Sequence, residues 1–484
     1  MSWGNDNVPM HRGRHRAARP DQVGRALRRA LVATIAPAVV LGLAGLIFVR
    51  TASGRIVDLV TDPQAITWLL VGLGVVWVAW IALICRTYLR GRALVVSRPL
   101  QIAGGFGVFV MCVAVTAPMA AGARYAYVTK DLISSVFTDE QSATAPTEVS
   151  AENPWGKRNR VNVLLLGGDG SVHRPGVRTD SVILASINTH TGATVLFSLP
   201  RNLQDVPFKP GSKLASLYPN GFTDGQNDNS AEYFLNAIYR NVPAVHPGVL
   251  GRTDNEGADA VKLGVSGALG IRVDYYVLVN LAGFRRLVDA IGGITVNINE
   301  RVPIGGNTDA HIPPDRYLEP GPNQRLNGFN ALWFTRGRYG STDYKRMERQ
   351  RCALDAIVAE ASPLKVLRRY TRLANASKEI VRTDIPSKLL SAFVDLAGKV
   401  KGHPITSVGF ERSAEFDPNA PDFDYVHAAV QAALHPVRRS GGGSTGSTSG
   451  GSTVNAGGAT GKTVTPAKAS DTRSDCAYHP VSTP

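Results

Sequence analysis

Three long apolar runs occupy the first quarter of the chain. Each has about 20 residues, the length needed to cross the hydrocarbon core of a bilayer, and they lie at Ala30–Val49, Ala65–Cys85 and Leu100–Gly122. A cleaved signal peptide has a single and shorter apolar core. The pattern therefore predicts three transmembrane helices within residues 30–122.

Beyond residue 156 the apolar runs become short and alternate with segments of helical periodicity. Short runs bounded by turn residues predict strands at 161–167, 181–188, 194–199, 275–280, 294–298 and 405–410. Helical spacing lies between them, at 230–240, 256–269, 281–291, 327–335, 342–361, 364–374, 387–399 and 424–435. This interleaving predicts an α/β domain, a three-layer α/β/α sandwich with a mixed central sheet.

Polar and low-complexity segments separate these regions. Residues 1–29 are basic and polar, which favours a disordered cytoplasmic tail. We expect a stalk over 123–156 and the globular domain over 157–437. The composition then shifts to Gly, Ser, Thr and Ala, so we expect residues 438–484 to form a flexible tail.

The positive charge flanks the apolar runs. Of the formal net charge of +15, nine charges come from two segments: residues 1–29 hold seven arginines against two aspartates, and residues 86–98 hold four arginines and no acid. Residues 50–64 have two arginines balanced by two aspartates. The positive-inside rule then predicts a multi-pass protein of the cell membrane with a cytoplasmic N-terminus. Three crossings place the globular domain outside.

Four cysteines are too few for a disulfide scaffold. Cys85 and Cys112 lie in apolar runs, whereas Cys352 and Cys476 lie in the part expected outside the membrane. An oxidising compartment permits a bond between the latter two. A disulfide and two unpaired thiols are both open at this point.

Two carboxylates and an arginine follow the first predicted strand of the globular domain. The apolar run 161–166 ends at two glycines and is followed by Asp169, Arg178 and Asp180. Open α/β sheets bind ligands at such an edge. Because two aspartates alone repel phosphate, the set favours an anion held through a cation, as Mg²⁺ is held by one or two carboxylates and substrate phosphates. A turn with a surface ion pair is the alternative.

Three further arginines stand near the ends of predicted elements. Arg201 follows the strand 194–199 after Pro200, which ends the ladder. Arg336 and Arg338 alternate about one residue, so in an extended chain their side chains point to the same side. Guanidinium groups grip phosphate oxygens bidentately. A solvated charge cluster is the alternative.

The helix predicted from Thr342 has a mixed inner face. At about 100° per residue, one arc contains Asp343, Arg346, Met347, Gln350, Leu354, Ile357 and Val358. The last three positions make this the core-facing side, so its polar residues need partners or a ligand. A satisfied buried ion pair is the alternative.

Taken together, these segments resemble the LytR-CpsA-Psr family of bacterial cell-wall ligases. The matching pieces occur in family order over about residues 157–437 and are NVLLLGGDG, RTDSVILASIN, FSLPR, YYVLVNLAGFRRLVDAIGGITVNI, RLNGFNALWFTRGR and TDYKRMERQR. The resemblance implies a membrane-anchored, Mg²⁺-dependent phosphotransferase, with Mn²⁺ as an alternative metal. Such enzymes move a glycan from a polyprenyl-pyrophosphate carrier to a peptidoglycan hydroxyl and form a phosphodiester.

The motifs also imply roles for individual residues. Asp169 and Asp180 look like the metal ligands. The pyrophosphate-binding set looks like Arg178, Arg201, Arg336, Arg338, Arg346 and Gln350. Asp343 looks like the group that activates the acceptor hydroxyl, and it forms the expected catalytic set with Arg178, Arg336 and Arg338.

The chain departs from the family pattern in three places. Pro200-Arg201-Asn202 stands where the family usually has Pro-Arg-Asp, so no carboxylate role is assigned there. Three transmembrane helices exceed the family's usual single anchor, and the Gly/Ser/Thr tail replaces its frequent C-terminal domain. Usage rich in Ala, Arg, Gly and Val favours a high-GC actinobacterial source, which makes arabinogalactan the expected cargo.

Two other functions fit the same residues. A polyprenyl-pyrophosphate hydrolase would use water as the acceptor, and a non-enzymatic membrane protein would bind lipid-linked glycan or regulate wall synthesis. The chain has no P-loop, HExxH or CxxC signature. A nucleic-acid partner is not expected, because the basic residues flank apolar runs without interleaved aromatic residues.

Overall fold

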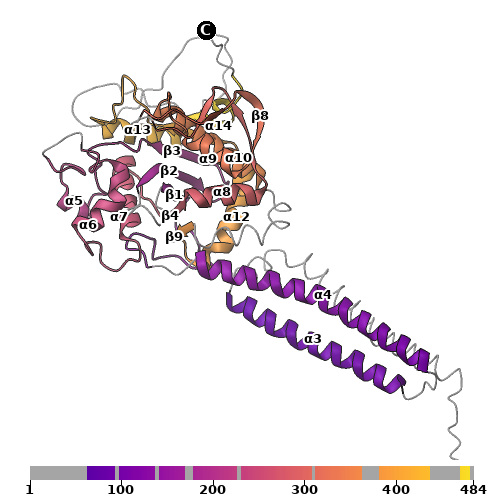
Figure 1. Ribbon diagram of the computed structural model, residues 1–484. Helices are drawn as coiled ribbons and strands as arrows, with labels where there is room; N and C mark the ends of the chain where they lie inside the picture. The colour runs from indigo at the N-terminus through magenta and orange to yellow at the C-terminus, as the bar shows by residue number, and fades with distance from the viewer. Residues whose placement is uncertain are drawn as a thin grey trace, which may run out of the picture. The chain divides into compact units, whose positions relative to one another are not determined.

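The computed structural model describes two compact units, residues 1–130 and 131–484 (Figure 1). The described residues are 63–92, 98–136, 141–168, 178–225, 230–307, 311–361, 381–436 and 469–479. All statements below concern these ranges.

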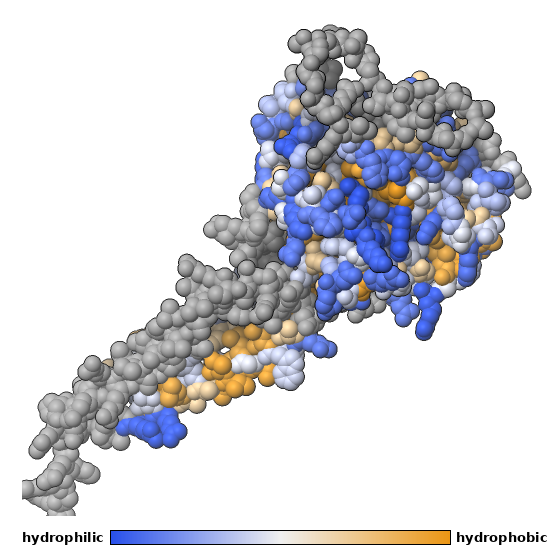
Figure 2. Space-filling view, turned by 180° about the vertical axis from the view of Figure 1, so that it is seen from behind, coloured by the Kyte–Doolittle hydropathy of each residue, from blue (hydrophilic) through white to orange (hydrophobic). Residues whose placement is uncertain are grey.

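The first unit contains two long apolar helices, α3 (Pro63–Arg92) and α4 (Arg98–Val136). Both have the length and composition to cross a membrane. Their surfaces leave large apolar side chains exposed, among them Trp68 at 75% and Phe106 at 68%, and Figure 2 shows orange apolar surface along this unit. The second and third predicted spans are therefore helices, and the first, at 30–49, lies outside the described residues.

The two helices contact each other through polar and small side chains. The indole nitrogen of Trp77 donates to the hydroxyl of Thr116 at 3.0 Å, and a Cβ added at Gly104 would lie 3.3 Å from the Tyr88 ring. The helix α4 continues to Val136, beyond the predicted end at Gly122, so the beginning of the predicted stalk is helical.

The second unit is built on a mixed sheet of order β11-β10-β3-β2-β1-β4-β9. Its strands are β1 (Arg160–Gly168), β2 (Thr179–Asn188), β3 (Thr194–Leu199), β4 (Tyr275–Asn280), β9 (Val381–Thr383), β10 (Ile405–Gly409) and β11 (Ser470–Asp471). The pairs β1–β4 and β3–β10 are parallel, and the other neighbours are antiparallel. The predicted α/β class and mixed sheet are confirmed.

Helices cover both faces of this sheet. Alternate residues of a strand point to opposite faces: Leu164 and Leu166 of β1 pack in one cluster, and Val163 packs in another. The first cluster includes η1 (Leu235–Ala237), α6 (Ile238–Val245), α7 (Glu256–Leu269) and α13 (Phe423–Leu434). The opposite face carries η2 (Ser387–Leu389), α12 (Leu390–Lys401) and α10 (Asp343–Glu360).

A smaller subdomain packs around α10. Its parts are α8 (Leu281–Ile291), β5 (Ile294–Ile298), β6 (Val302–Ile304), β7 (Arg316–Leu318), β8 (Gly321–Leu326) and α9 (Gly328–Arg336). β5 pairs with β8 and β6 with β7. These elements enclose their own apolar cluster, which includes Val302 and Phe334.

Several boundaries differ from the predictions. The helix predicted at 230–240 begins only after Phe234, whose backbone is extended (φ −76°, ψ 159°). The strands β6, β7, β9 and β11 were not predicted, because two or three residues are too short to show a periodic pattern. The six-residue strand β8 was also missed, because its sequence GPNQRL shows no alternation of apolar and polar residues. The helix predicted at 364–374 lies outside the described residues.

Both ends of the predicted domain extend further than expected. On the N-terminal side, Ser142 donates to Asp259 at 2.7 Å and Trp155 packs against Phe393, so part of the predicted stalk belongs to the domain. On the C-terminal side, β11 joins the sheet edge and α14 (Thr472–Asp475) follows it. Cys352 and Cys476 form a disulfide, which settles the open alternative. Residues 470–479 of the expected flexible tail are therefore ordered against the domain.

Candidate active site

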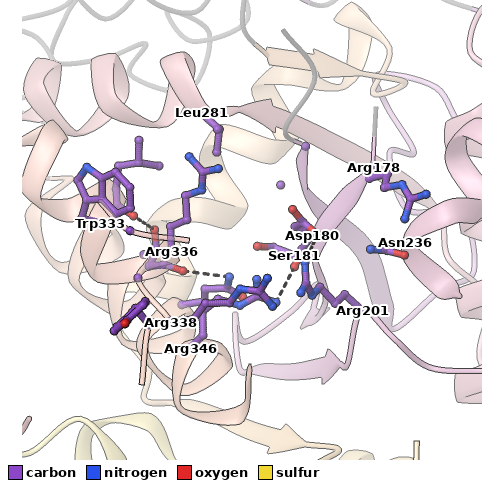
Figure 3. A pocket seen from close by; sticks show the side chains of 18 of the residues that line it. Arg178, Asp180, Ser181, Arg201, Asn236, Leu281, Trp333, Arg336, Arg338 and Arg346 are labelled. Carbon is purple, nitrogen blue, oxygen red and sulfur yellow. Dashed lines mark hydrogen bonds and ion pairs between the residues drawn. The ribbon is translucent and has the colours of Figure 1, made fainter. Parts of the chain in front are cut away.

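A cavity of about 400 Å³ opens at one edge of the main sheet. Its wall comes from the end of β1, the start of β2, the second residue after β3, the end of α9 and the first half of α10. Five of the residues that line it are arginines: Arg178, Arg201, Arg336, Arg338 and Arg346. Figure 3 shows Arg201 and Arg346 side by side next to Asp180.

The sheet topology explains why these residues meet. β2 runs antiparallel to both β1 and β3, so the end of β1, the start of β2 and the end of β3 lie at the same edge. A Cβ at Gly167 would lie 3.0 Å from the Cβ and Oγ of Ser181, so glycine permits the close approach of β1 and β2. Asp180 and Arg201 are therefore neighbours although the β2–β3 hairpin separates them in sequence.

The helix α10 brings the second set of polar residues. Thr342 is its N-cap and its hydroxyl accepts from the backbone N–H of Lys345 at 3.3 Å. Asp343 is thus the first helical residue, where a carboxylate is favoured by the helix dipole. Arg346 and Gln350 follow on the same side and are only 4% and 9% exposed.

The predicted inner face of this helix is confirmed. Met347 is buried with Arg346 and Gln350, and Leu354 and Val358 pack against the cluster on the sheet. The side-chain amide of Gln350 donates to the backbone oxygen of Thr335 at 3.2 Å. Gln350 thereby ties α10 to the end of α9, beside the cavity.

A network of ion pairs joins the two sets. Arg201 donates from Nη1 to Asp180 Oδ1 at 2.8 Å and from Nε to Asp343 Oδ2 at 2.9 Å. The same Asp343 carboxylate lies 3.5 Å from Arg346 Nη2 and 3.8 Å from Arg338 Nη1. Asp343 does not itself line the cavity. Three arginines therefore surround Asp343 and are held by it at the cavity wall.

The ionisation of Asp180 follows from these contacts. Burial alone would raise its pKa, but Arg201 and Arg346 outweigh burial, and the pKa lies below its usual value. Burial likewise opposes the charge of Arg201, yet Asp180 and Asp343 raise its pKa. Burial lowers the pKa of Arg346, although its guanidinium stays charged at neutral pH. The cavity therefore holds a charged aspartate within an excess of cations.

Two buried polar atoms at the cavity lack partners among the described residues. They are Nε of Arg346 and Oδ1 of Asn236. An unsatisfied buried polar group costs about 1–3 kcal/mol, and more when it is charged. Five arginines against three paired carboxylates, Asp180, Glu232 and Asp343, with an unsatisfied guanidinium N–H, form a site that fits a bound polyanion.

Arg178 adopts a different orientation from the other arginines. Its Nη2 lies 2.5 Å from Oε1 of Glu232, and its Nη1 donates to the backbone oxygen of Ala231 at 3.4 Å. Figure 3 shows the guanidinium turned to the side of Asn236, away from Arg336. Arg178 lines the cavity as predicted and is also tied to the segment before η1.

The prediction that Arg336 and Arg338 lie in an extended chain is wrong. Arg336 is the last residue of the helix α9, and Gly337 follows as its C-cap. A Cβ at Gly337 would lie 2.4 Å from the backbone oxygen of Pro303, so β6 approaches the chain closely here. Both arginines line the cavity, but Arg336 extends towards Leu281 (Figure 3).

Of the two predicted metal ligands, only Asp180 lies among the described residues. Asp180 lines the cavity and carries charge, whereas Asp169 lies outside the described residues. Within the described ranges, no group of three His, Cys, Asp or Glu side chains is placed to hold a metal. A single carboxylate fits Mg²⁺, which is commonly held by one or two carboxylates together with substrate phosphates.

The structure adds residues that the sequence did not single out. Asn236 is buried in η1, and its amide hydrogen-bonds Asp180. Trp333 lines the opposite wall, and Gly305, Gly306 and Asn307 close the cavity after β6. Trp333 lies inside the segment RLNGFNALWFTRGR and could have been noticed there. Asn236 belongs to no such segment, and only the tertiary fold brings it to Asp180.

The mixed sheet, the arginine-rich cavity and the ionised Asp180 in its wall define an α/β domain with a cavity that fits a polyanion. The profile of the LytR_cpsA_psr family matches residues 125–433. The chain belongs to this family.

The chain is also similar to individual proteins. The chain is 30% identical over 260 residues to biofilm regulatory protein A of Streptococcus mutans, covering 52% of this chain and 55% of that protein. It is 28% identical over 294 residues to the polyisoprenyl-teichoic acid–peptidoglycan teichoic acid transferase TagU of Enterococcus faecalis, covering 58% and 80%. Among solved structures, Bacillus subtilis TagV matches with a TM-score of 0.40 at 23% identity, covering 57% and 98%.

Proposed function

We propose that the protein is a membrane-anchored phosphotransferase that moves a glycopolymer from a polyprenyl-pyrophosphate carrier to a peptidoglycan hydroxyl. The observation that carries this proposal is the excess of arginine charge in the cavity. Pyrophosphate places several anionic oxygens close together, and guanidinium groups bind such oxygens bidentately. The relatives named TagU, which are teichoic acid–peptidoglycan transferases, support the same reaction class.

The reaction needs one bond formed and one broken. The acceptor hydroxyl oxygen attacks the phosphorus that carries the glycan, and the bond from that phosphorus to the bridging pyrophosphate oxygen breaks. The products are a glycan–phosphodiester–peptidoglycan linkage and polyprenyl monophosphate. Phosphoryl transfer of this kind depends chiefly on positioning and charge stabilisation.

Each predicted residue has a place in this step. Arg178, Arg201, Arg336, Arg338 and Arg346 bind the pyrophosphate oxygens, assisted by Gln350. When Arg201 and Arg346 turn to the phosphates, they release Asp343, which accepts the proton of the acceptor hydroxyl. In the absence of ligand, the same carboxylate holds these arginines at the wall.

Asp180, together with Asp169, would hold Mg²⁺, or alternatively Mn²⁺. The bound metal would supply further neutralisation of pyrophosphate charge. The ionised state of Asp180 and its place in the cavity wall support this role.

The helices α3 and α4 support the proposed membrane anchoring. Both are apolar along their length, and the arginine-rich segments 1–29 and 86–98 favour the cytoplasmic side. With the further apolar run at 30–49, three crossings would put the domain outside the membrane. The disulfide between Cys352 and Cys476 is compatible with an oxidising, extracytoplasmic location.

A transfer assay tests the proposal. Purified full-length protein in detergent would be mixed with a polyprenyl-pyrophosphate oligosaccharide, Mg²⁺ and a peptidoglycan oligomer. We expect saccharide phosphate to appear on the acceptor, and to be lost with EDTA or in the Asp180→Ala variant. Free saccharide phosphate without acceptor product would show a hydrolase instead. Binding without turnover would favour a non-enzymatic role.

A further inference from the structure

A row of arginines and aromatic rings leads away from the cavity along α9. Trp333 and Arg336 line the cavity, and the Arg336 guanidinium lies 5.6 Å from the centre of the Trp333 ring. One helical turn earlier, the Phe329 ring lies 6.5 Å from Trp333. Arg285 and Arg316 both contact Phe329, at 5.3 and 5.5 Å. We call these five residues the α9 ladder.

The ladder is assembled from three parts of the subdomain. Phe329 and Trp333 are four residues apart in α9 and therefore share a helix face. Arg285 comes from α8, and Arg316 comes from β7, where it pairs with Ile304 of β6. The residues directly after Ile304, Gly305 and Gly306, line the cavity. The hairpin that supplies Arg316 thus also forms the cavity rim.

The positive charge of the ladder is open to solvent. The side chains of Arg285, Arg316 and Arg336 are exposed, and the two rings are half-buried. In the part of the chain that the structure describes, no carboxylate lies within 4.0 Å of these three guanidinium groups. Asp289, nearby on α8, instead accepts the backbone N–H of Gly328 at 2.7 Å. The ladder therefore presents charge that the described fold does not neutralise.

The alternative is that the ladder is a set of ordinary surface cation–π contacts without a ligand. Such contacts occur about once per 70–80 residues and stabilise by about 0.5–1 kcal/mol each when exposed. In the described residues, four such contacts fall between residues 285 and 336, and three of them share two neighbouring rings and end at the cavity. That concentration and direction favour a binding surface continuous with the site.

We propose that the α9 ladder binds the glycan chain of the donor and that this glycan is acidic, with phosphate or carboxylate groups along its length. This inference rests on the proposed function. Sugar rings pack on half-buried aromatic faces, and regularly spaced anions meet the exposed arginines. A neutral polymer such as arabinogalactan would leave the arginines without partners.

The donor fits this surface better than the acceptor does. The donor glycan is bonded to the pyrophosphate, so it must leave the cavity along an adjacent wall, and Trp333 and Arg336 form such a wall. Asp343, the proposed acceptor-side group, is held by Arg201 next to Asp180. Figure 3 shows Arg201 and Trp333 on opposite sides of the cavity.

The test uses two probes and a double variant. The probes are a synthetic hexasaccharide with one phosphate per sugar and its dephosphorylated counterpart. The variant is Arg285→Gln/Arg316→Gln, which leaves every cavity residue unchanged. The matched control is Arg412→Gln/Arg473→Gln, which removes two exposed arginines elsewhere on the domain. Calorimetry on the full-length protein in detergent measures the dissociation constants.

We expect the ladder variant to bind the phosphorylated probe about tenfold more weakly than wild type, equal to about 1.4 kcal/mol. The control variant and the neutral probe should show no change. Equal affinity of the wild type and the ladder variant for the phosphorylated probe would overturn the inference. Equal weakening for both probes would also overturn it, because charge would then not be what is recognised.

Steady-state kinetics show whether the ladder binds the donor or the acceptor. They also distinguish a failure of this inference from a failure of the proposed function. In the transfer assay, the ladder variant should raise KM for an acidic long-chain donor and leave kcat and the KM of a single-sugar donor unchanged. A raised KM for the peptidoglycan oligomer alone would assign the ladder to the acceptor and overturn the inference. If wild type transfers nothing but binds the acidic probe through the ladder, the proposed function fails and the binding surface stands.

Discussion

Two clusters of charged side chains lie in the same domain and differ in how their charge is compensated. In one, Lys262 lies between Asp384 and Asp259, at 2.5 and 3.8 Å, and all three are almost fully buried. Hydroxyl and backbone donors satisfy the two acids: Ser142 and Thr253 for Asp259, and the N–H of Tyr276 for Asp384. We call this cluster closed because its charges are compensated within the fold. It lines no part of the arginine cavity.

The cavity cluster has the opposite character. Its five arginines outnumber the three carboxylates paired with them, Asp180, Glu232 and Asp343, and Arg346 has a buried N–H without a partner among the described residues. A buried charge is stable when its partners are complete and costly when they are not. The compensated cluster therefore stabilises the fold, whereas the cavity cluster leaves positive charge that fits a bound anion.

The largest effect is expected when the closed cluster is broken. Lys262→Met leaves Asp259 and Asp384 buried without their cation, so the free energy of unfolding should fall by about 3–5 kcal/mol. Urea unfolding followed by circular dichroism measures this. Lys209→Met, at an exposed lysine of the same domain, is the control. Unchanged stability of Lys262→Met would refute the structural role of the cluster.

The disulfide is expected to stabilise the packing of α10 against the C-terminal segment. Cys352 lies in α10 and Cys476 follows α14, and 124 residues separate them. Replacing both by serine should lower the free energy of unfolding by about 2–5 kcal/mol. The pair Cys85→Ser/Cys112→Ser, which removes two free cysteines of the first unit, should leave the domain's stability unchanged. Equal effects of both pairs would contradict this assignment.

The cavity cluster should respond in activity rather than in stability. Arg346→Met removes a charge aimed at the proposed pyrophosphate, and transfer should fall by about 100-fold. The free energy of unfolding should change by less than about 1 kcal/mol, because methionine fills similar space and the arginine was incompletely paired. Arg412→Met should leave both unchanged. If Arg346→Met destabilised the domain as much as Lys262→Met, the cavity cluster would contribute to stability as the closed cluster does.

The smallest effect concerns pH. The folded-state pKa of Asp180 lies below its unfolded value. The Asp180–Arg201 pair therefore stabilises the fold at pH values above the unfolded pKa, and this contribution is lost as pH falls through the folded pKa. Arg201→Met should move the acid-unfolding midpoint to slightly higher pH, as followed by circular dichroism. An unchanged midpoint would show that the pair contributes no pH dependence.

The sequence predicts the local elements well and the contacts between them poorly. The longer strands and the inner face of α10 follow from periodicity, because 2.0- and 3.6-residue repeats are local signals. The pairing of Arg201 with Asp343 joins positions 142 residues apart, and no local pattern encodes it. Family resemblance brought both residues into one candidate site without predicting that they contact each other.

Other features could not be predicted for specific physical reasons. Lys262 lies in a helix whose residues are nearly all buried, and a lysine is ordinarily expected at the surface. β11 has two residues at the far end of a Gly/Ser/Thr-rich segment, and its pairing with β10 depends on the edge that the fold presents. Arg285 and Arg316 belong to different elements, so the α9 ladder exists only in three dimensions.

The proposed pyrophosphate site is tested most directly by measuring whether the cavity binds a prenyl pyrophosphate through Arg201 and Arg346. Calorimetry would compare farnesyl pyrophosphate, with Mg²⁺, on full-length wild type and on Arg201→Met/Arg346→Met, with thermal unfolding run alongside. We predict that the ligand binds wild type and that the double variant, still folded, binds it at least about 100-fold more weakly. Equal affinity of the two folded proteins would contradict the claim that these arginines exist to hold pyrophosphate.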